Sequence, residues 1–179
     1  MADGKPVHLG EIFNYRMDRR ILACTIVIFL AAIFVYSIFF DILIPNMEAG
    51  DSYRDQVGAL FIVPIFILAL GQLLVGGIVF HLFAKAAKSA DFLRALLQSS
   101  VLTLWFSLTY ALFPKYGPFY YIVFVYGEAP WYALPIELAW TISAILIGTY
   151  LSRKLFGLPC RVGFFASVVV YTIMTLGAS

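Results

Sequence analysis

Residues 57–84 decide the fold: they read VGALFIVPIFILALGQLLVGGIVFHLFA, 28 residues without a single Asp, Glu, Lys or Arg. At 1.5 Å per residue, a helix of this length exceeds the roughly 30 Å hydrocarbon core of a bilayer. We expect it to tilt, to kink at Pro64 or to project beyond the membrane. Lys85 and Lys88 follow it directly. The stretch therefore predicts a transmembrane helix that ends at a basic loop.

The rest of the chain has the same apolar character. Of its 179 residues, 63% are hydrophobic and 12% are charged, against roughly 25% charged residues in a soluble domain. Four further apolar runs have the length of a membrane span, and we place them at about 21–40, 95–113, 135–152 and 162–178. The predicted fold is all-α: one transmembrane domain, residues 21–179, forming a polytopic membrane helical bundle of about five helices.

Two segments do not qualify as spans. Residues 116–131, YGPFYYIVFVYGEAPW, are too short and too rich in Tyr, Gly and Pro, and we place them at the outer interface of the membrane. Residues 1–20 are interpreted as a cytoplasmic tail, because the first apolar run is longer than that of a signal peptide.

The distribution of Lys and Arg predicts the orientation. Basic residues that flank membrane spans are held on the cytoplasmic side. With five spans, ten basic residues fall on one side and only Arg54 and Lys115 on the other. The ten are Lys5, Arg16, Arg19, Arg20, Lys85, Lys88, Arg94, Arg153, Lys154 and Arg161. The sequence thus predicts a multi-pass protein with a cytoplasmic N-terminus and an outside C-terminus, in a prokaryotic plasma membrane.

Polar residues within the spans are the candidates for function, since an unsatisfied polar group in hydrocarbon costs several kcal/mol. Glu137 is the one acidic residue inside a predicted span. If Pro135 opens the helix, Glu137 falls in the first turn, where the helix dipole stabilises a carboxylate. The alternative is an ion site or a proton relay.

Small and polar residues in two spans indicate close helix packing. Gly71, Gly76 and Gly77 surround Gln72, whose amide can bond to another helix. Ser99, Thr103 and Ser107 share one helical face, since they are four residues apart. We interpret these seven residues as packing residues. The alternative role is contact with a substrate.

The cytoplasmic basic loops have two interpretations. They hold the loops inside, or they form a docking face for anionic headgroups or an acidic partner. The docking candidates are Lys85, Lys88, Arg94, Arg153, Lys154 and Arg161.

No catalytic or metal motif is present in the sequence. It contains no phosphate loop, no HExxH and no GxSxG. His8 and His81 do not form the intramembrane pair that a haem needs, and Cys24 and Cys160 are not spaced as a metal-binding pair. The net charge of +2 does not support binding to nucleic acid. We therefore expect a non-enzymatic protein without a cofactor, whose partners are the lipid bilayer and other membrane proteins or copies of itself.

The chain resembles the Yip family, the Rab/Ypt-interacting membrane proteins, and within it the short prokaryotic members. The resemblance lies in residues 61–114, which combine an apolar helix with glycines, a short basic loop and a Phe that leads into a helix with small residues. Residues 138–157, with Glu137 before them and Pro159 after them, are similar to the family's next helix and turn. The resemblance implies a helical bundle that acts as a scaffold or partner-binding module.

Two other functions are compatible with the sequence. The first is an accessory subunit of a respiratory or transport complex, which its small size would suit. The second is a small channel or carrier that uses Glu137 and the face of Ser99, Thr103 and Ser107.

Overall fold

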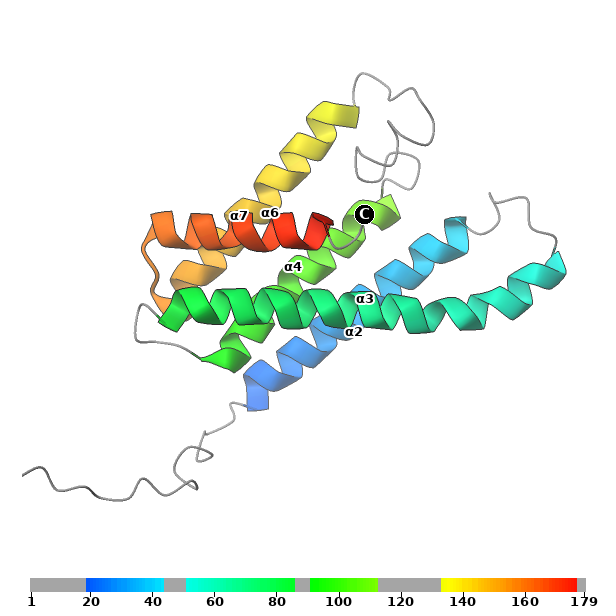
Figure 1. Cartoon of the computed structure of the whole chain (residues 1–179), viewed down its shortest axis with the longest axis horizontal. Coiled ribbons are helices and arrows are strands. Elements are labelled where there is room, and N and C mark those ends of the chain that lie inside the picture. The colour runs from blue at the N-terminus through cyan, green and yellow to red at the C-terminus, as the bar shows by residue number, and fades with distance from the viewer. Residues whose placement is uncertain (1–18, 44–50, 86–90, 113–132, 177–179) are drawn as a thin grey trace, which may run out of the picture.

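The computed structural model describes residues 19–43, 51–85, 91–112 and 133–176, and this part of the chain is all-helical (Figure 1). The all-α fold expected from the sequence is confirmed. Each predicted span falls on one of five helices: α2 (Arg19–Leu43), α3 (Asp51–Lys85), α4 (Phe92–Leu112), α6 (Ala133–Phe156) and α7 (Cys160–Leu176). The predicted interfacial segment 116–131, Lys88 and the tail up to residue 18 lie outside the described residues.

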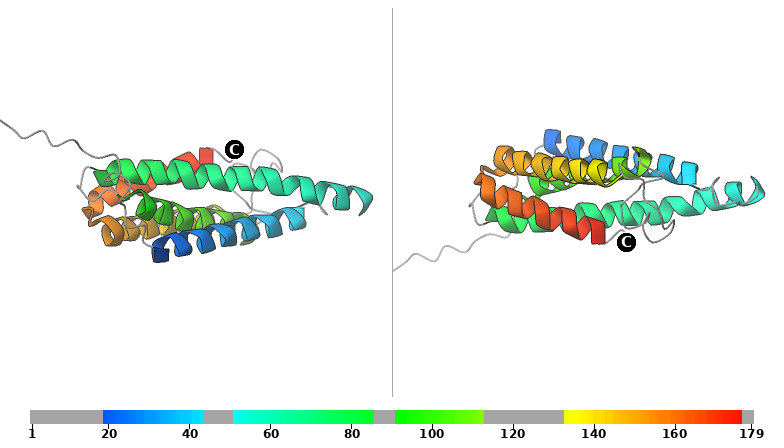
Figure 2. Two further views of the ribbon diagram at one scale, coloured as in Figure 1. Left: turned by 90° about the horizontal axis from the view of Figure 1, so that it is seen from below. Right: turned by 90° about the horizontal axis from the view of Figure 1, so that it is seen from above.

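The helices form two layers, seen edge-on in Figure 2. One layer holds α3 and α7, and the other holds α2, α4 and α6. Helices α3 and α4 each contact all four other described helices, and α4 is the central helix because its apolar span is the more buried of the two. Its buried face combines small residues and hydroxyls, such as Ala95, Ser99 and Thr103, with the larger Leu102 and Phe106.

Three helices contain stretches long and apolar enough to cross a membrane: Arg19–Ile38, Val63–Lys85 and Phe92–Thr109. Cys160–Thr175 is a shorter apolar helix. Large apolar side chains cover the outside of the bundle, among them Val27, Phe34, Ile67 and Leu146. A soluble protein rarely exposes such a continuous apolar surface, so lipid is the medium that fits it.

Helix α3 is longer than any bilayer requires. It continues through Pro64 for 35 residues, and Figure 1 shows its first turns extending past the ends of α2 and α4. The structure thus shows α3 projecting beyond its neighbours, while the expectation that the long apolar run tilts, kinks or projects beyond the membrane stays a prediction.

Local signals in the sequence set two helix ends. Asp91 caps α4: its carboxylate Oδ1 accepts a hydrogen bond from the Leu93 N–H at 3.0 Å, which satisfies one free amide of the first turn. Gly157 ends α6 with a φ of +66°, and its N–H donates to the Arg153 carbonyl at 3.0 Å. A left-handed glycine of this kind is a common helix stop, and it turns the chain into α7.

The start of α6 differs from the prediction. The helix begins at Ala133, two residues before Pro135, so Glu137 is its fifth residue and lies beyond the first turn. Proline is tolerated throughout a first turn because those N–H groups have no helical partner. Pro135 therefore does not mark the first helical residue, and the proposed stabilisation of Glu137 by free first-turn amides loses its geometric basis. The side chain of Glu137 lies outside the described part of the structure.

Candidate functional site

Gln72 links three helices in the interior of the bundle. The hydroxyl of Tyr36 on α2 donates to Gln72 Oε1 at 2.9 Å, and both side chains are buried. The Ser99 hydroxyl on α4 donates to the Gln72 backbone carbonyl at 3.1 Å. Gln72 Nε2 is buried and has no hydrogen-bond partner in the described structure. The amide thus bonds across to α2, as its position in an apolar span suggested.

Gly76 and Gly77 lie where α3 meets α4. A Cβ at Gly76 would collide with the Ser99 hydroxyl and lie 3.0 Å from Met174 Cε. A Cβ at Gly77 would lie 2.7 Å from Leu96 Cδ2. Both glycines are buried. Their missing side chains allow the two helices to approach closely, which is the usual role of glycine in membrane bundles.

Gly71 lies on a different side of α3 from Gly76. It is exposed, and a Cβ built on it meets nothing within 4 Å, so it takes no part in the packing of the described helices. It lines an open recess of about 280 Å³ between α3 and α7, which we call the Gly71 recess. The recess is lined by Ile67, Leu68, Gly71, Gln72, Val75, Ile173 and Met174.

The hydroxyls of α4 bond inside the bundle. Thr103 donates to the Ser99 carbonyl at 3.0 Å, and Ser107 donates to the Leu104 carbonyl at 2.8 Å. Both residues, like Ser99, have no exposed surface. The structure therefore brings the three predicted hydroxyls to one buried face, but Ser99 alone bonds to another helix through its side chain.

A second close contact, which was not predicted from the sequence, joins α6 and α7. A Cβ at Gly148 would lie 2.9 Å from Ser167 Cβ, and a Cβ at Gly163 would lie 2.9 Å from Ser152 Cβ. Each helix thus offers one glycine and one serine, four residues apart, to the other. The signal was present in the sequence: small residues at i and i+4 mark helix interfaces in membranes, and both Gly148–Ser152 and Gly163–Ser167 follow that spacing.

Gln98 is the second interior glutamine, and its role was also not predicted from the sequence. Its Nε2 donates to the Gly148 carbonyl and to the Ser152 hydroxyl, each at 2.7 Å. The side chain is fully buried. These bonds join α4 to α6, next to the contact between α6 and α7. Farther along the same pair of helices, Trp105 and Trp140 stack with ring centroids 4.4 Å apart.

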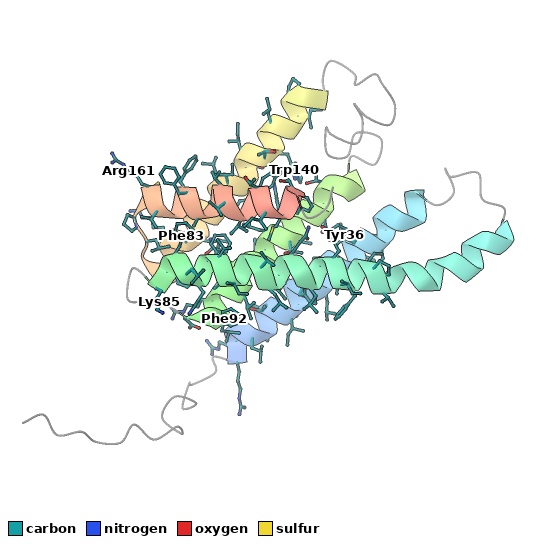
Figure 3. The ribbon with its side chains drawn as sticks, viewed as in Figure 1. Tyr36, Phe83, Lys85, Phe92, Trp140 and Arg161 are labelled. Atoms are coloured by element: carbon teal, nitrogen blue, oxygen red, sulfur yellow. The ribbon has the colours of Figure 1, made fainter. Side chains whose placement is uncertain are left out.

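The described docking candidates gather at one end of the bundle, formed by the starts of α2, α4 and α7 and the ends of α3 and α6 (Figure 1). We call this the basic end. Lys85 and Arg161 mark it in Figure 3, and Arg153 and Lys154 lie in the last turn of α6. Arg94 is different, because its guanidinium Nη1 donates to the Leu155 carbonyl at 2.9 Å and its Nε lies 3.4 Å from Asp91. Arg94 therefore connects α4 to α6.

His81 lies one turn before the basic end. Its ring packs edge-to-face against Phe92, with centroids 5.6 Å apart, and its Nδ1 is buried without a hydrogen-bond partner in the described structure. Among the described residues, no group of three or more His, Cys, Asp or Glu is placed to hold a metal ion. Cys24 and Cys160 are free and exposed.

Comparison with known proteins adds no relative: no family model matches the chain, and neither the curated proteins nor the solved structures give a match. The Yip resemblance stays a prediction from sequence. The candidate site is therefore defined by geometry alone: the interior contacts of Gln72, Gln98 and the glycines, and the open Gly71 recess on the outside of the described helices.

Proposed function

We propose that this chain is a non-enzymatic integral membrane protein of Yip type that binds another membrane protein as a scaffold, and that the Gly71 recess receives a transmembrane helix of that partner. One observation carries the proposal. Gly76 and Gly77 are both used inside the bundle, whereas Gly71 faces outward over an open recess. It is the one glycine of that cluster that remains free to admit an external helix.

The depth of the recess favours a helix as the occupant. Gly71 precedes Lys85 by 14 residues on one helix, which corresponds to about 21 Å. A lipid headgroup at the level of Lys85 does not reach that depth. An acyl chain and a transmembrane helix both do, and an outward-facing glycine such as Gly71 is the feature that lets another helix approach closely. The α3 residues of the recess, from Ile67 to Val75, extend over about two helical turns. That length suits the side chains of one crossing helix.

The closed interior favours a binding role over a channel. Ser99, Thr103 and Ser107 have no exposed surface and all donate to backbone carbonyls, so this hydroxyl face is used for packing within the described helices. The proposal includes five spans, with the basic end in the cytoplasm and the C-terminus outside, as the positive-inside rule predicts. An accessory subunit would use the same recess, within a complex of fixed stoichiometry.

The test is a pull-down in mild detergent with the full chain and two variants. Gly71→Leu fills the recess, whereas Ala139→Leu adds the same bulk to an exposed position on α6. We expect Gly71→Leu to reduce recovery of the partner about tenfold or more and Ala139→Leu to leave it unchanged. Equal recovery of the partner with Gly71→Leu and with the native chain would exclude the recess as the binding site. Self-association lost in the same variant would identify the partner as a second copy, and co-purification in fixed ratio with redox or transport subunits would identify the accessory role.

A further inference from the structure

Each of the four outer helices carries an exposed Lys or Arg at the basic end, next to apolar side chains on the outside of the bundle. On α6, Lys154 follows the exposed Tyr150, and its Nζ lies 5.8 Å from the centre of that ring. On α7, Arg161 precedes Phe165, which is 62% exposed. On α3, the exposed Leu82 is followed by Lys85, and α2 begins with the exposed Arg19. In each case an exposed cation lies at the basic end, and exposed apolar side chains lie farther along the same helix, away from that end.

The central helix lacks this arrangement. The cation of α4, Arg94, is bound to the Leu155 carbonyl and to Asp91. Asp91 is also the only acidic residue at the basic end within the described ranges. The cations of the outer helices therefore face the surroundings with little compensating negative charge from the described residues.

We propose that the basic end binds the headgroups of anionic phospholipids around the circumference of the bundle. The phosphates contact Lys85, Arg153, Lys154 and Arg161, while the acyl chains lie along the apolar stripes beneath them. Basic residues next to membrane spans attract anionic lipid by about 1 kcal/mol each, a preference of about fivefold per cation.

Two features favour lipid over an acidic protein. The cations are distributed over both layers of the bundle, on α2, α3, α6 and α7, as a surrounding leaflet requires; a compact protein contact would use one side. Exposed rings lie one turn deeper than the cations on α6 and α7. Tyr150 precedes Lys154 by four residues, and Phe165 follows Arg161 by four, about 6 Å along each helix. Rings at that level match the boundary between headgroups and acyl chains.

The test measures the association of spin-labelled phosphatidylglycerol and phosphatidylcholine with the full chain in liposomes. The native chain is expected to prefer phosphatidylglycerol, by about fivefold at each cation-bearing position, and the preference should fall in 1 M salt. A variant with Lys85, Arg153, Lys154 and Arg161 all changed to Gln should lose the preference at α3, α6 and α7 and keep only the part contributed by α2, which begins with Arg19. All four side chains are exposed, so the bundle should fold.

Two controls separate charge from other effects. Changing Lys85 and Lys154 to Arg keeps the charges and should keep the preference. Changing Arg54 and Lys115 to Gln neutralises the two basic residues assigned to the other side and should also keep it. A native chain without preference, or a four-Gln variant that retains the full preference, would overturn the proposal. The proposal would also be overturned if the four-Gln variant kept its lipid preference but no longer recovered an acidic protein in a pull-down.

Discussion

Replacing Gly148 by Ala should destabilise the bundle, whereas the same change at Gly71 should not. An Ala Cβ at position 148 would lie 2.5 Å from Ser167 Oγ and 2.9 Å from Ser167 Cβ, and 3.4 Å from Leu102 Cδ1. The hydroxyl can rotate away, but the Ser167 Cβ is fixed to its backbone, so α6 and α7 must separate. At Gly71, an added Cβ meets nothing within 4 Å.

The magnitude follows from two opposing terms. Overpacking a closed contact costs about 1–3 kcal/mol, while Ala in place of a helical Gly gains about 1 kcal/mol. The gain applies at both positions, but the cost applies only at Gly148. Gly148→Ala should therefore be less stable than Gly71→Ala by about 2 kcal/mol.

The assay is equilibrium unfolding of each variant in detergent micelles with increasing denaturing detergent, followed by helical circular dichroism. A third variant completes the cycle: Ser167→Gly removes the colliding Cβ, and the Ser167 hydroxyl bonds only within its own helix, to the Gly163 carbonyl. Combined with Gly148→Ala, it should recover about 1 kcal/mol or more relative to additivity. Equal stability of the two Ala variants, or strict additivity in the cycle, would refute the packing assigned to α6 and α7.

Three further changes test single interactions in the same unfolding assay. Tyr36→Phe removes the hydroxyl that donates to Gln72 and should cost about 0.6 kcal/mol, the average for such bonds in membranes, and at most about 1.7 kcal/mol; no loss would mean that the bond does not contribute. Gln98→Leu removes two bonds to α6 and should cost about 1–3 kcal/mol, more than Tyr36→Phe, and the reverse order would count against its central role. Asp91→Ala removes the cap of α4 at Leu93 and should cost about 1 kcal/mol, while Asp91→Asn, which can still cap, should restore most of it.

The sequence predicted the helices well because their signal is local. An apolar run of about 20 residues is a helix in lipid whatever its neighbours are, since every backbone polar group must be satisfied within the segment. The boundaries were less certain. An apolar run does not mark where a helix begins: α3 starts at Asp51, before the apolar run that starts at residue 57.

The candidate site was harder to predict because it depends on which way each helix faces. Gly71 and Gly76 belong to one glycine-rich run, but five residues separate them, about 140° around a helix. They therefore cannot face the same neighbour, and the structure places Gly76 inside the bundle and Gly71 outside. That difference was readable from the spacing, but which of the two faces inward was not.

The role of Gln98 could not be predicted from its own position in the sequence. It lies beside Ser99 in a helix whose hydroxyl face was recognised, but its partners are the Gly148 carbonyl and Ser152, about 50 residues later in the chain. A backbone carbonyl has no signature in a sequence, so its bond to Gln98 appears only after the helices are packed.

The central claim is that five membrane-spanning helices place the basic end on the cytoplasmic side, and thiol labelling tests it most directly. With Cys24 changed to Ser, Cys160 is the one thiol of the chain, exposed at the start of α7 at the basic end. A membrane-impermeant maleimide added to intact cells should leave Cys160 unmodified and should react with it in inverted vesicles. A Cys at position 48, in a chain without other thiols, should show the opposite pattern. Modification of Cys160 in intact cells, or the same pattern at both positions, would contradict the account.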